Sequence, residues 1–226
     1  MTADDALYRL LTWTSPSYPT GAYSYSHGLE WAVEAGEVRD VATLVDYIDA
    51  MLARGGGWID AVLFARAYEC AHDVVAFEEI ADLAAAFRGS AETALESQQQ
   101  GTAFLAVTRR AWPHTALDAF AERRGDLPIA HSVAMALACA AHEVPLASAL
   151  SAWLHATAAN LVSAGVRLIP LGQTDGQIAT ARLAPRIAAI AADALAMPLD
   201  ELGTAAPLLE LCSIRHETQY TRLFRS

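Results

Sequence analysis

The chain has 226 residues, of which 54% are hydrophobic and 18% are charged, and its formal net charge is −11 at pH 7. This length suits one large domain or two small ones. The acidic balance argues against a protein that binds nucleic acids broadly, because phosphates need a basic face.

The same composition indicates a cytoplasmic protein. No run of about 18 consecutive apolar residues occurs, so no membrane-spanning helix is expected. The first five residues lack the basic start and apolar block of a signal peptide. Cys70, Cys139 and Cys212 lie far apart and form no CxxC pair, which favours reduced thiols.

Helical periodicity dominates the first half of the chain. Leu7, Leu10 and Leu11 share one face of a short first helix, and the Pro- and Gly-rich stretch 14–21 predicts a loop after it. The glycine run 55–57 should break or kink a helix. Further helices are expected over 26–36, 41–52 (capped by Asp40), 58–72, 74–88 and 90–112 (opened by Ser90).

The second half continues in the same style, with helices expected over 115–124, 131–142 and 145–166. Thr174 and Gln177 fit a capping box at the start of the next helix, and Pro185 should kink or restart that helix. No alternating strand pattern and no internal repeat is found. The sequence therefore predicts an all-α, bundle-like single domain over 1–214 and a C-terminal interaction tail over 215–226.

A search for catalytic and metal-binding patterns returns little. The seven histidines form no HxxxH or HExxH pair, and no cysteine stands at ligand spacing from a histidine. There is no GxSxG elbow, and a phosphate-binding loop of the Walker type is excluded because the chain has no lysine. We expect no catalytic residues and no metal site in this chain.

The first of three dense segments, residues 16–30, joins a Pro/Gly loop to a stretch rich in hydroxyl groups and tyrosines. Ser24 or Ser26 could cap the helix that follows. Gly28 inside that helix costs about 1 kcal/mol relative to Ala. It therefore indicates close approach by another backbone or a bound group, unless the glycine is merely tolerated.

The second segment, residues 160–177, places Asn160 and Arg167 in an otherwise apolar helix. If they are buried, these polar side chains must have partners. We expect Arg167 to pair internally or to line a buried polar route. The alternative is a surface arginine that the dipole favours at a helix C-terminus.

The third segment, residues 215–225, carries three arginines, one tyrosine and one phenylalanine in an acidic protein. It shows neither a helical apolar stripe nor low complexity. Arginine and aromatic side chains are the types that anchor interfaces. We expect a tail that is mobile in the free protein and orders on a partner; the alternative is a frayed end with chance aromatics.

Together the three segments resemble the urease accessory protein UreF family. The family's patterns are similar to residues 15–30, 160–177 and 215–226, and the order and separation of these stretches match as well. The resemblance spans nearly the whole chain. Departures are small: Thr20 stands where the family usually has Val or a similar residue, and Tyr23 where Phe is common.

The resemblance implies a non-enzymatic helical chaperone for the maturation of urease by nickel insertion. Such proteins dimerise, bind UreD (also called UreH), recruit the GTPase UreG and dock on apo-urease. Nickel and GTP would then be handled by partner proteins, so no cofactor bound tightly by this chain is expected, nor any nucleic-acid or membrane partner. The subunit would couple GTP hydrolysis to nickel delivery.

Two other readings remain open. One is a helical enzyme or small-molecule-binding protein with a pocket near Tyr23, Tyr25 and Arg167. The other is a nickel-storing metallochaperone, for which His27, His216 and Cys212 would have to meet in three dimensions. The residues expected to bind partners are Tyr23, Ser24, Tyr25, Ser26, Gly28, Glu30, Arg167, Gln173, Asp175, Gln177, Arg215, His216, Glu217, Gln219, Tyr220, Arg222, Phe224 and Arg225.

Overall fold

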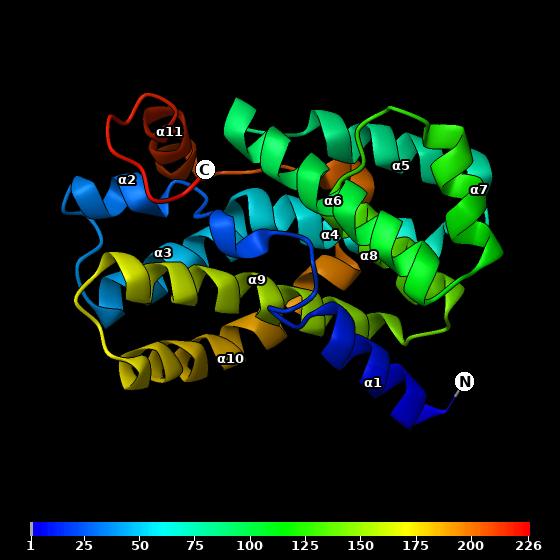
Figure 1. Cartoon of the computed structure of the whole chain (residues 1–226), viewed down its shortest axis with the longest axis horizontal. Coiled ribbons are helices and arrows are strands. Elements are labelled where there is room, and N and C mark those ends of the chain that lie inside the picture. The colour runs from blue at the N-terminus through cyan, green and yellow to red at the C-terminus, as the bar shows by residue number, and fades with distance from the viewer. Residues whose placement is uncertain (1) are drawn as a thin grey trace.

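The computed structural model describes residues 2–226, and over these residues all regular structure is helical (Figure 1). The all-α fold class is confirmed. The helices are α1 (Ala3–Trp13), α2 (Leu29–Glu34), α3 (Val41–Arg54), α4 (Gly56–Glu69), α5 (Val74–Ala86), α6 (Ala91–Ala111), α7 (Thr115–Arg124), α8 (His131–Ala141), α9 (Leu146–Leu168), α10 (Gln173–Ala196) and α11 (Pro207–His216), with short 3-10 turns η1 (Ala22–Ser24) and η2 (Leu199–Glu201).

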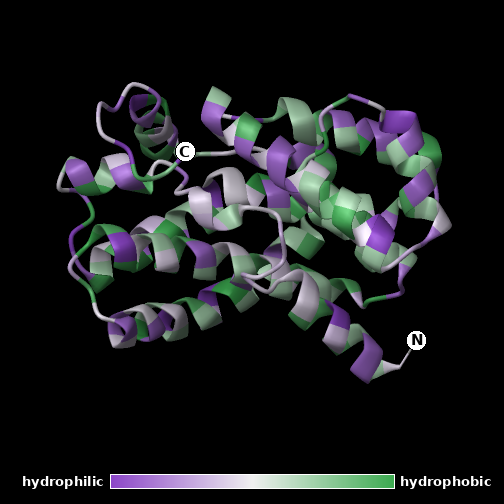
Figure 2. Cartoon of the chain, in the orientation of Figure 1, coloured by the Kyte–Doolittle hydropathy of each residue, from purple (hydrophilic) through white to green (hydrophobic). Residues whose placement is uncertain are grey.

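The core is built around α4 and α8. Every residue of α8 from Ser132 to Ala140 is buried, and α4 is buried on most of its surface. A helix that is apolar all round must lie inside the fold. Accordingly, α8 lies between α4 and α6, and α4 also packs against α3, α9 and α10. Figure 2 shows hydrophilic residues on the outer turns of α1 and α7.

Local signals set most helix boundaries as expected. Asp40 Oδ1 accepts a hydrogen bond from the Thr43 amide at 2.9 Å, and Ser90 Oγ accepts one from the Thr93 amide at 3.2 Å. Both caps satisfy a backbone donor that has no partner inside its helix. Gly55 separates α3 from α4, as the glycine run predicts.

Two predictions for α10 are wrong. The helix starts at Gln173, one residue before the predicted capping threonine, and Asp175 Oδ2 accepts from the Gly172 amide at 2.9 Å in place of the expected box. Pro185 does not interrupt the helix, which runs for 24 residues. Pro185 is exposed, so water can satisfy the carbonyl that loses its intrahelical partner.

The leucines of α1 divide between core and solvent. Leu10 is buried together with Ala6 and Trp13, whereas Leu7 is 55% and Leu11 64% exposed. Figure 1 shows α1 extending from the edge of the molecule toward the N-terminus, so the body covers only one side of this helix.

The prediction that the C-terminal tail has no core position is also wrong. Helix α11 continues to His216, across the predicted boundary between 214 and 215. His216, Phe224 and Ser226 are buried. We call residues 217–226 the terminal strap, because this stretch leaves α11 and lies across the body. The sequence hides this arrangement because the buried residues are separated by exposed ones without a helical or strand period.

Candidate functional site

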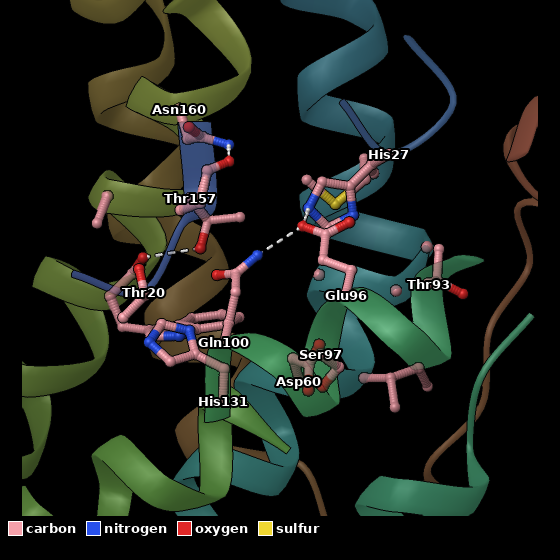
Figure 3. A pocket seen from close by; sticks show the side chains of 18 of the residues that line it. Thr20, His27, Asp60, Thr93, Glu96, Ser97, Gln100, His131, Thr157 and Asn160 are labelled. Atoms are coloured by element: carbon pink, nitrogen blue, oxygen red, sulfur yellow. Dashed lines mark hydrogen bonds and ion pairs between the residues drawn. The ribbon is translucent and has the colours of Figure 1, made fainter. Parts of the chain in front are cut away.

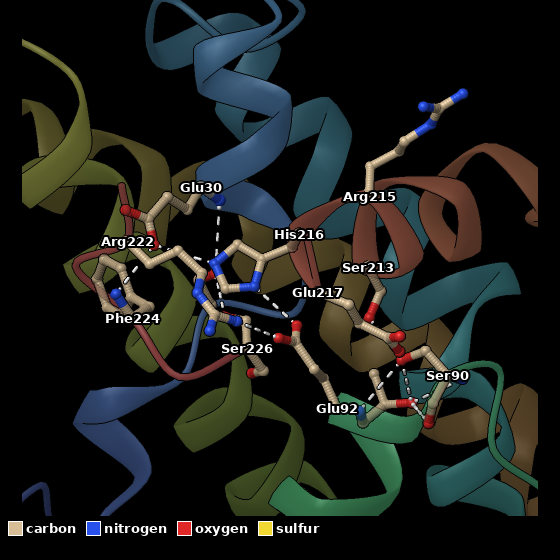
Figure 4. A network of polar contacts seen from close by, with 12 residues as sticks. Glu30, Ser90, Glu92, Ser213, Arg215, His216, Glu217, Arg222, Phe224 and Ser226 are labelled. Carbon is tan, nitrogen blue, oxygen red and sulfur yellow. Dashed lines mark hydrogen bonds and ion pairs between the residues drawn. The ribbon is translucent and has the colours of Figure 1, made fainter. Parts of the chain in front are cut away.

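The three dense segments of the sequence meet at one place in the fold. The Ser26 amide donates a hydrogen bond to the Ser226 carbonyl at 2.8 Å, and the Arg225 amide donates to the Ser24 carbonyl at 2.8 Å. The Ser26 hydroxyl also donates to the Ser226 carbonyl. These bonds join the end of the terminal strap to the loop before α2. Figure 4 shows the polar network on the other side of this junction.

Glu30 is the central acceptor of the strap. Its carboxylate is buried and accepts hydrogen bonds from the Leu223 amide at 2.6 Å and the Phe224 amide at 2.9 Å, and one of its oxygens lies 3.1 Å from His216 Nε2. A buried carboxylate needs several donors to compensate for the loss of water. The strap supplies two of them from its backbone, so Glu30 and the strap depend on each other.

Glu92 holds the strap from α6. Its carboxylate accepts a hydrogen bond from the Arg222 guanidinium at 2.8 Å, and its other oxygen lies 2.7 Å from His216 Nδ1. The side chains of Glu92 and His216 are 11% and 0% exposed, so this network is largely shielded from solvent. Charge-assisted hydrogen bonds of this kind are stronger than those between neutral groups.

Glu96, one turn further along α6, connects the strap to the interior. Its carboxylate accepts from the Ser226 hydroxyl at 2.8 Å, from His27 Nε2 at 3.0 Å and from the Gln100 amide at 2.8 Å. Burial alone would lower the pKa of His27, but the Glu96 carboxylate outweighs it and the pKa of His27 is raised. We call Glu30, Glu92 and Glu96 the carboxylate cradle.

Arg167 joins the second segment to the strap. Its guanidinium lies 4.4 Å from the centre of the Phe224 ring and donates to the Tyr23 carbonyl at 2.9 Å. Arg167 therefore has partners within the chain, as one reading predicts, but it is exposed and lies in the last turn of α9, as the alternative reading predicts. A cation above an aromatic face is held by the ring quadrupole.

Asn160 and Tyr25 complete the junction beneath the strap. Asn160 Nδ2 donates to the Ala22 carbonyl at 2.9 Å, which fixes η1 against α9. The Tyr25 hydroxyl donates to Gln99 on α6. The guanidinium of Arg225 lies 5.9 Å from the centre of the Tyr25 ring. Asn160 thus finds the partners that its position in an apolar helix demands.

Gly28 marks a close backbone contact, as one of the two sequence readings predicts. The residue is not inside α2 but at its N-cap, with φ of 76°. A Cβ at this position would lie 2.6 Å from the Ser213 nitrogen of α11. Ser26 takes the capping role, since its Oγ accepts from the Glu30 amide at 3.4 Å, while Ser24 lies in η1.

The remaining strap residues divide between anchoring and exposure. Glu217 accepts from the Ala91 amide at 3.1 Å, and the Gln219 side chain donates to Glu34. Tyr220 is fully exposed, and in Figure 4 Arg215 points away from the network. We use the name outer face for the exposed residues of α11 and the strap, which are Leu208, Leu211, Ile214, Arg215, Tyr220, Arg222, Leu223 and Arg225.

Several of these residues were missed by sequence reasoning. Leu208 and Leu211, which are 75% and 41% exposed, lie one helical turn apart on α11, and that spacing was the available signal. Glu92 and Glu96 also lie one turn apart, but on a polar helix they look like ordinary solvated residues. No local signal distinguishes them.

The start of α10 lies apart from this junction. Gln173 and Gln177 line a groove of about 420 Å³ between α9 and α10, and Arg167 lines the same groove. Asp175 caps α10. Gln173 and Gln177 thus share a groove with Arg167 of the junction, whereas Asp175 serves as the cap of α10.

A second feature is a pocket of about 650 Å³ that reaches from the surface toward buried polar groups (Figure 3). His27, Asp60, Glu96 and His131 line it, and Asp60 forms a two-pronged ion pair with Arg88 at 2.7 and 2.9 Å. Burial lowers the pKa of His131 to about 4, so its ring is neutral at pH 7. His131 Nε2 is shielded from solvent and makes no hydrogen bond in the described structure.

No metal-binding group emerges from the described residues. Over 2–226, no three His, Cys, Asp or Glu side chains are placed to share an ion. His27 and His216 face the carboxylate cradle, so the reading that joins them with Cys212 around a metal is not supported. Over the same range, no helix is both long enough and apolar enough to span a bilayer.

Fold and site define the class of protein: an all-helical protein with a surface assembled from three distant segments over a buried charged network. The chain belongs to the UreF family, because the model of that family, described as UreF, matches residues 38–184. Related proteins extend the match over nearly the whole chain.

Three such relatives are each named urease accessory protein UreF. The relative from Rhodopseudomonas palustris strain BisA53 is 51% identical over 98% of this chain and 93% of its own length. The relative from Granulibacter bethesdensis is 52% identical over 100% of this chain and 96% of its own. The relative from Xanthobacter autotrophicus is 50% identical over 98% of this chain and 91% of its own length.

Proposed function

We propose that this chain is a non-catalytic accessory protein of the cytoplasm that serves the maturation of urease by nickel insertion. Membership of the UreF family and the names of the relatives support this role. The observation that carries the structural part is the terminal strap, which is docked on a buried network through Phe224 while Tyr220 and Arg225 remain exposed.

We propose that the outer face binds a UreD/UreH-type partner. The face combines exposed leucines with three arginines in a protein of net charge −11, so it favours an acidic partner surface with an apolar centre. Tyr220 is its most exposed aromatic residue and suits a pocket on that partner. Because the strap is already docked, binding does not have to order it, which spares the conformational entropy of folding on contact.

In the proposed complex, the reactions with nickel and GTP take place on the partner proteins. We propose that the chain forms a homodimer, that the complex with UreD/UreH recruits UreG and docks on apo-urease, and that nickel and GTP are handled by those partners. In this role the chain couples GTP hydrolysis to nickel delivery by positioning its neighbours. Light scattering of the purified chain at micromolar concentration measures the dimer directly; a monomer would contradict that part of the proposal.

The test is co-expression with UreD/UreH, UreG and urease, followed by pull-down and by urease activation with nickel. Tyr220→Ala should weaken the complex by about 2 kcal/mol if the ring is a main anchor. Leu127→Ala is the matched control, because Leu127 is 56% exposed and lies between α7 and α8, outside the outer face. Equal binding by both variants would refute the outer face as the partner site.

A second candidate function is small-molecule binding in this pocket, favoured by the shielded Nε2 of His131 that lacks a hydrogen-bond partner. Tyr23 lines this pocket, whereas Tyr25 and Arg167 do not, so the predicted pocket residues are only partly brought together. A purified chain that carries a bound small molecule in native mass spectrometry, lost in His131→Phe, would favour this function. A chain that supports urease activation without one favours the accessory role.

A further inference from the structure

The ring of His216 is clamped between two carboxylates. Nδ1 lies 2.7 Å from an oxygen of Glu92, and Nε2 lies 3.1 Å from an oxygen of Glu30 (Figure 4). The His216 side chain is 0% exposed, and those of Glu30 and Glu92 are 8% and 11% exposed. Little water can therefore take the place of either contact.

The hydrogen count of this bridge requires an additional proton. An ionised carboxylate only accepts hydrogen bonds, and a neutral imidazole has one N–H and one lone pair. With a neutral ring, one nitrogen lone pair of His216 would face a carboxylate oxygen inside the protein. Such an arrangement sets two buried acceptors against each other with no hydrogen between them, which is costly. A further proton on the ring or on one carboxyl group removes the conflict.

The charge balance of the site agrees with this count. Glu30 and Glu92 bring two negative charges, and Arg222 brings one positive charge to Glu92 at 2.8 Å. One proton in the bridge makes the group neutral, which a site of low dielectric favours. The titratable and charged groups that face or adjoin the bridge are Glu30 from α2, Glu92 and Glu96 from α6, Arg222 and Glu217 from the strap, and His27 from the turn before α2.

We propose that His216 and the terminal strap together form a proton-linked latch, in which docking of this end of the chain takes up one proton into the bridge formed by Glu30, Glu92 and His216. The Leu223 and Phe224 amides donate to the same Glu30 carboxylate, so the bridge and the strap backbone form one unit. A consequence for partner binding rests on the proposed function: the outer face is assembled for its partner only while the bridge holds that proton.

The sign of the pH dependence follows from the uptake of a proton. Because docking binds one proton, mass action lowers the docking equilibrium constant as pH rises, by up to about tenfold per pH unit.

Hydrogen exchange of the Leu223 and Phe224 amides in the isolated chain tests the latch, because both amides are bonded only when the strap is docked. Their protection factors, corrected for the intrinsic effect of pH on exchange, should fall several-fold between about pH 7 and pH 8. Glu92→Gln should remove this slope, since its amide can donate to the lone pair of a neutral ring. His72→Gln, at an exposed histidine outside the site, is the control and should keep the slope.

Two results would overturn the latch: protection factors that do not change with pH in the natural sequence, or the same slope in Glu92→Gln. Both readouts use the chain alone, so they do not depend on any partner. A chain that shows the slope but captures no UreD/UreH-type partner at any pH would support the latch and contradict the proposed function.

Discussion

Gly28 offers the sharpest test of how the strap region is built, because two separate costs of adding one methyl group can be distinguished. In Gly28→Ala the new Cβ would lie 2.6 Å from the Ser213 nitrogen and 2.9 Å from the Cys212 carbonyl carbon. Both are backbone atoms of α11, so a side-chain rotation cannot relieve the clash. The residue also has φ of 76°, which an alanine adopts at a cost of about 1–2 kcal/mol.

The chain contains a matched control for the second cost. Gly36 has φ of 78°, but a Cβ there would meet nothing within 4 Å. Gly36→Ala should therefore lose only the conformational part, about 1–2 kcal/mol. Gly28→Ala should lose a further 1–3 kcal/mol or so from overpacking against α11, if the helix does not detach.

Urea denaturation followed by circular dichroism measures both variants. We expect Gly28→Ala to unfold at lower urea than Gly36→Ala and, because α11 carries the strap, to lose protection of the Phe224 amide as well. Equal destabilisation of the two variants, with the Phe224 amide still protected in Gly28→Ala, would show that backbone conformation alone decides, and that the contact with Ser213 is not tight.

Three other predictions follow from the site. The pKa of His27 is raised, so its ion pair with Glu96 stabilises the fold fully below the ordinary histidine pKa of about 6.5. This contribution is lost as pH rises through the raised pKa. Urea titrations of the natural chain should show the loss of stability, and those of His27→Gln should show less of it. Deletion of residues 215–226 should abolish partner capture. It should also lower the free energy of unfolding, because it removes the buried side chains of His216 and Phe224. An unchanged urea midpoint would mean that this segment does not stabilise the fold. Calorimetry of the isolated chain with nickel should show weak or no binding, and tight one-to-one binding would contradict the reading of the described residues as lacking a metal group.

Much of the fold was readable from the sequence because the relevant interactions are local. Caps at Asp40 and Ser90, the break at Gly55 and the boundaries of α7 depend on residues within four positions of one another. Pro185 shows the limit of such rules. Its effect on a helix depends on which side faces water, and packing against α3 and α9 decides that orientation.

For the candidate site too, the sequence predicted the features that depend on local residue patterns. The sequence by itself singled out the three segments, since hydroxyl groups, an arginine in an apolar helix and aromatic residues among arginines are unusual where they stand. It also determined the all-α class and the acidic body. These properties are carried by residue types and by spacings within one helix.

Only the tertiary structure decided what the terminal segment does. Its buried acceptors, Glu30, Glu92 and Glu96, look like solvated helix carboxylates until the strap covers them, and His216 lies 186 positions from Glu30 in the chain. Burial, and with it the need for every charge and hydrogen bond to be matched, arises when distant segments exclude water together. The sequence predicted that His216 and Phe224 bind a partner, whereas in the fold both side chains are buried against the chain's own helices.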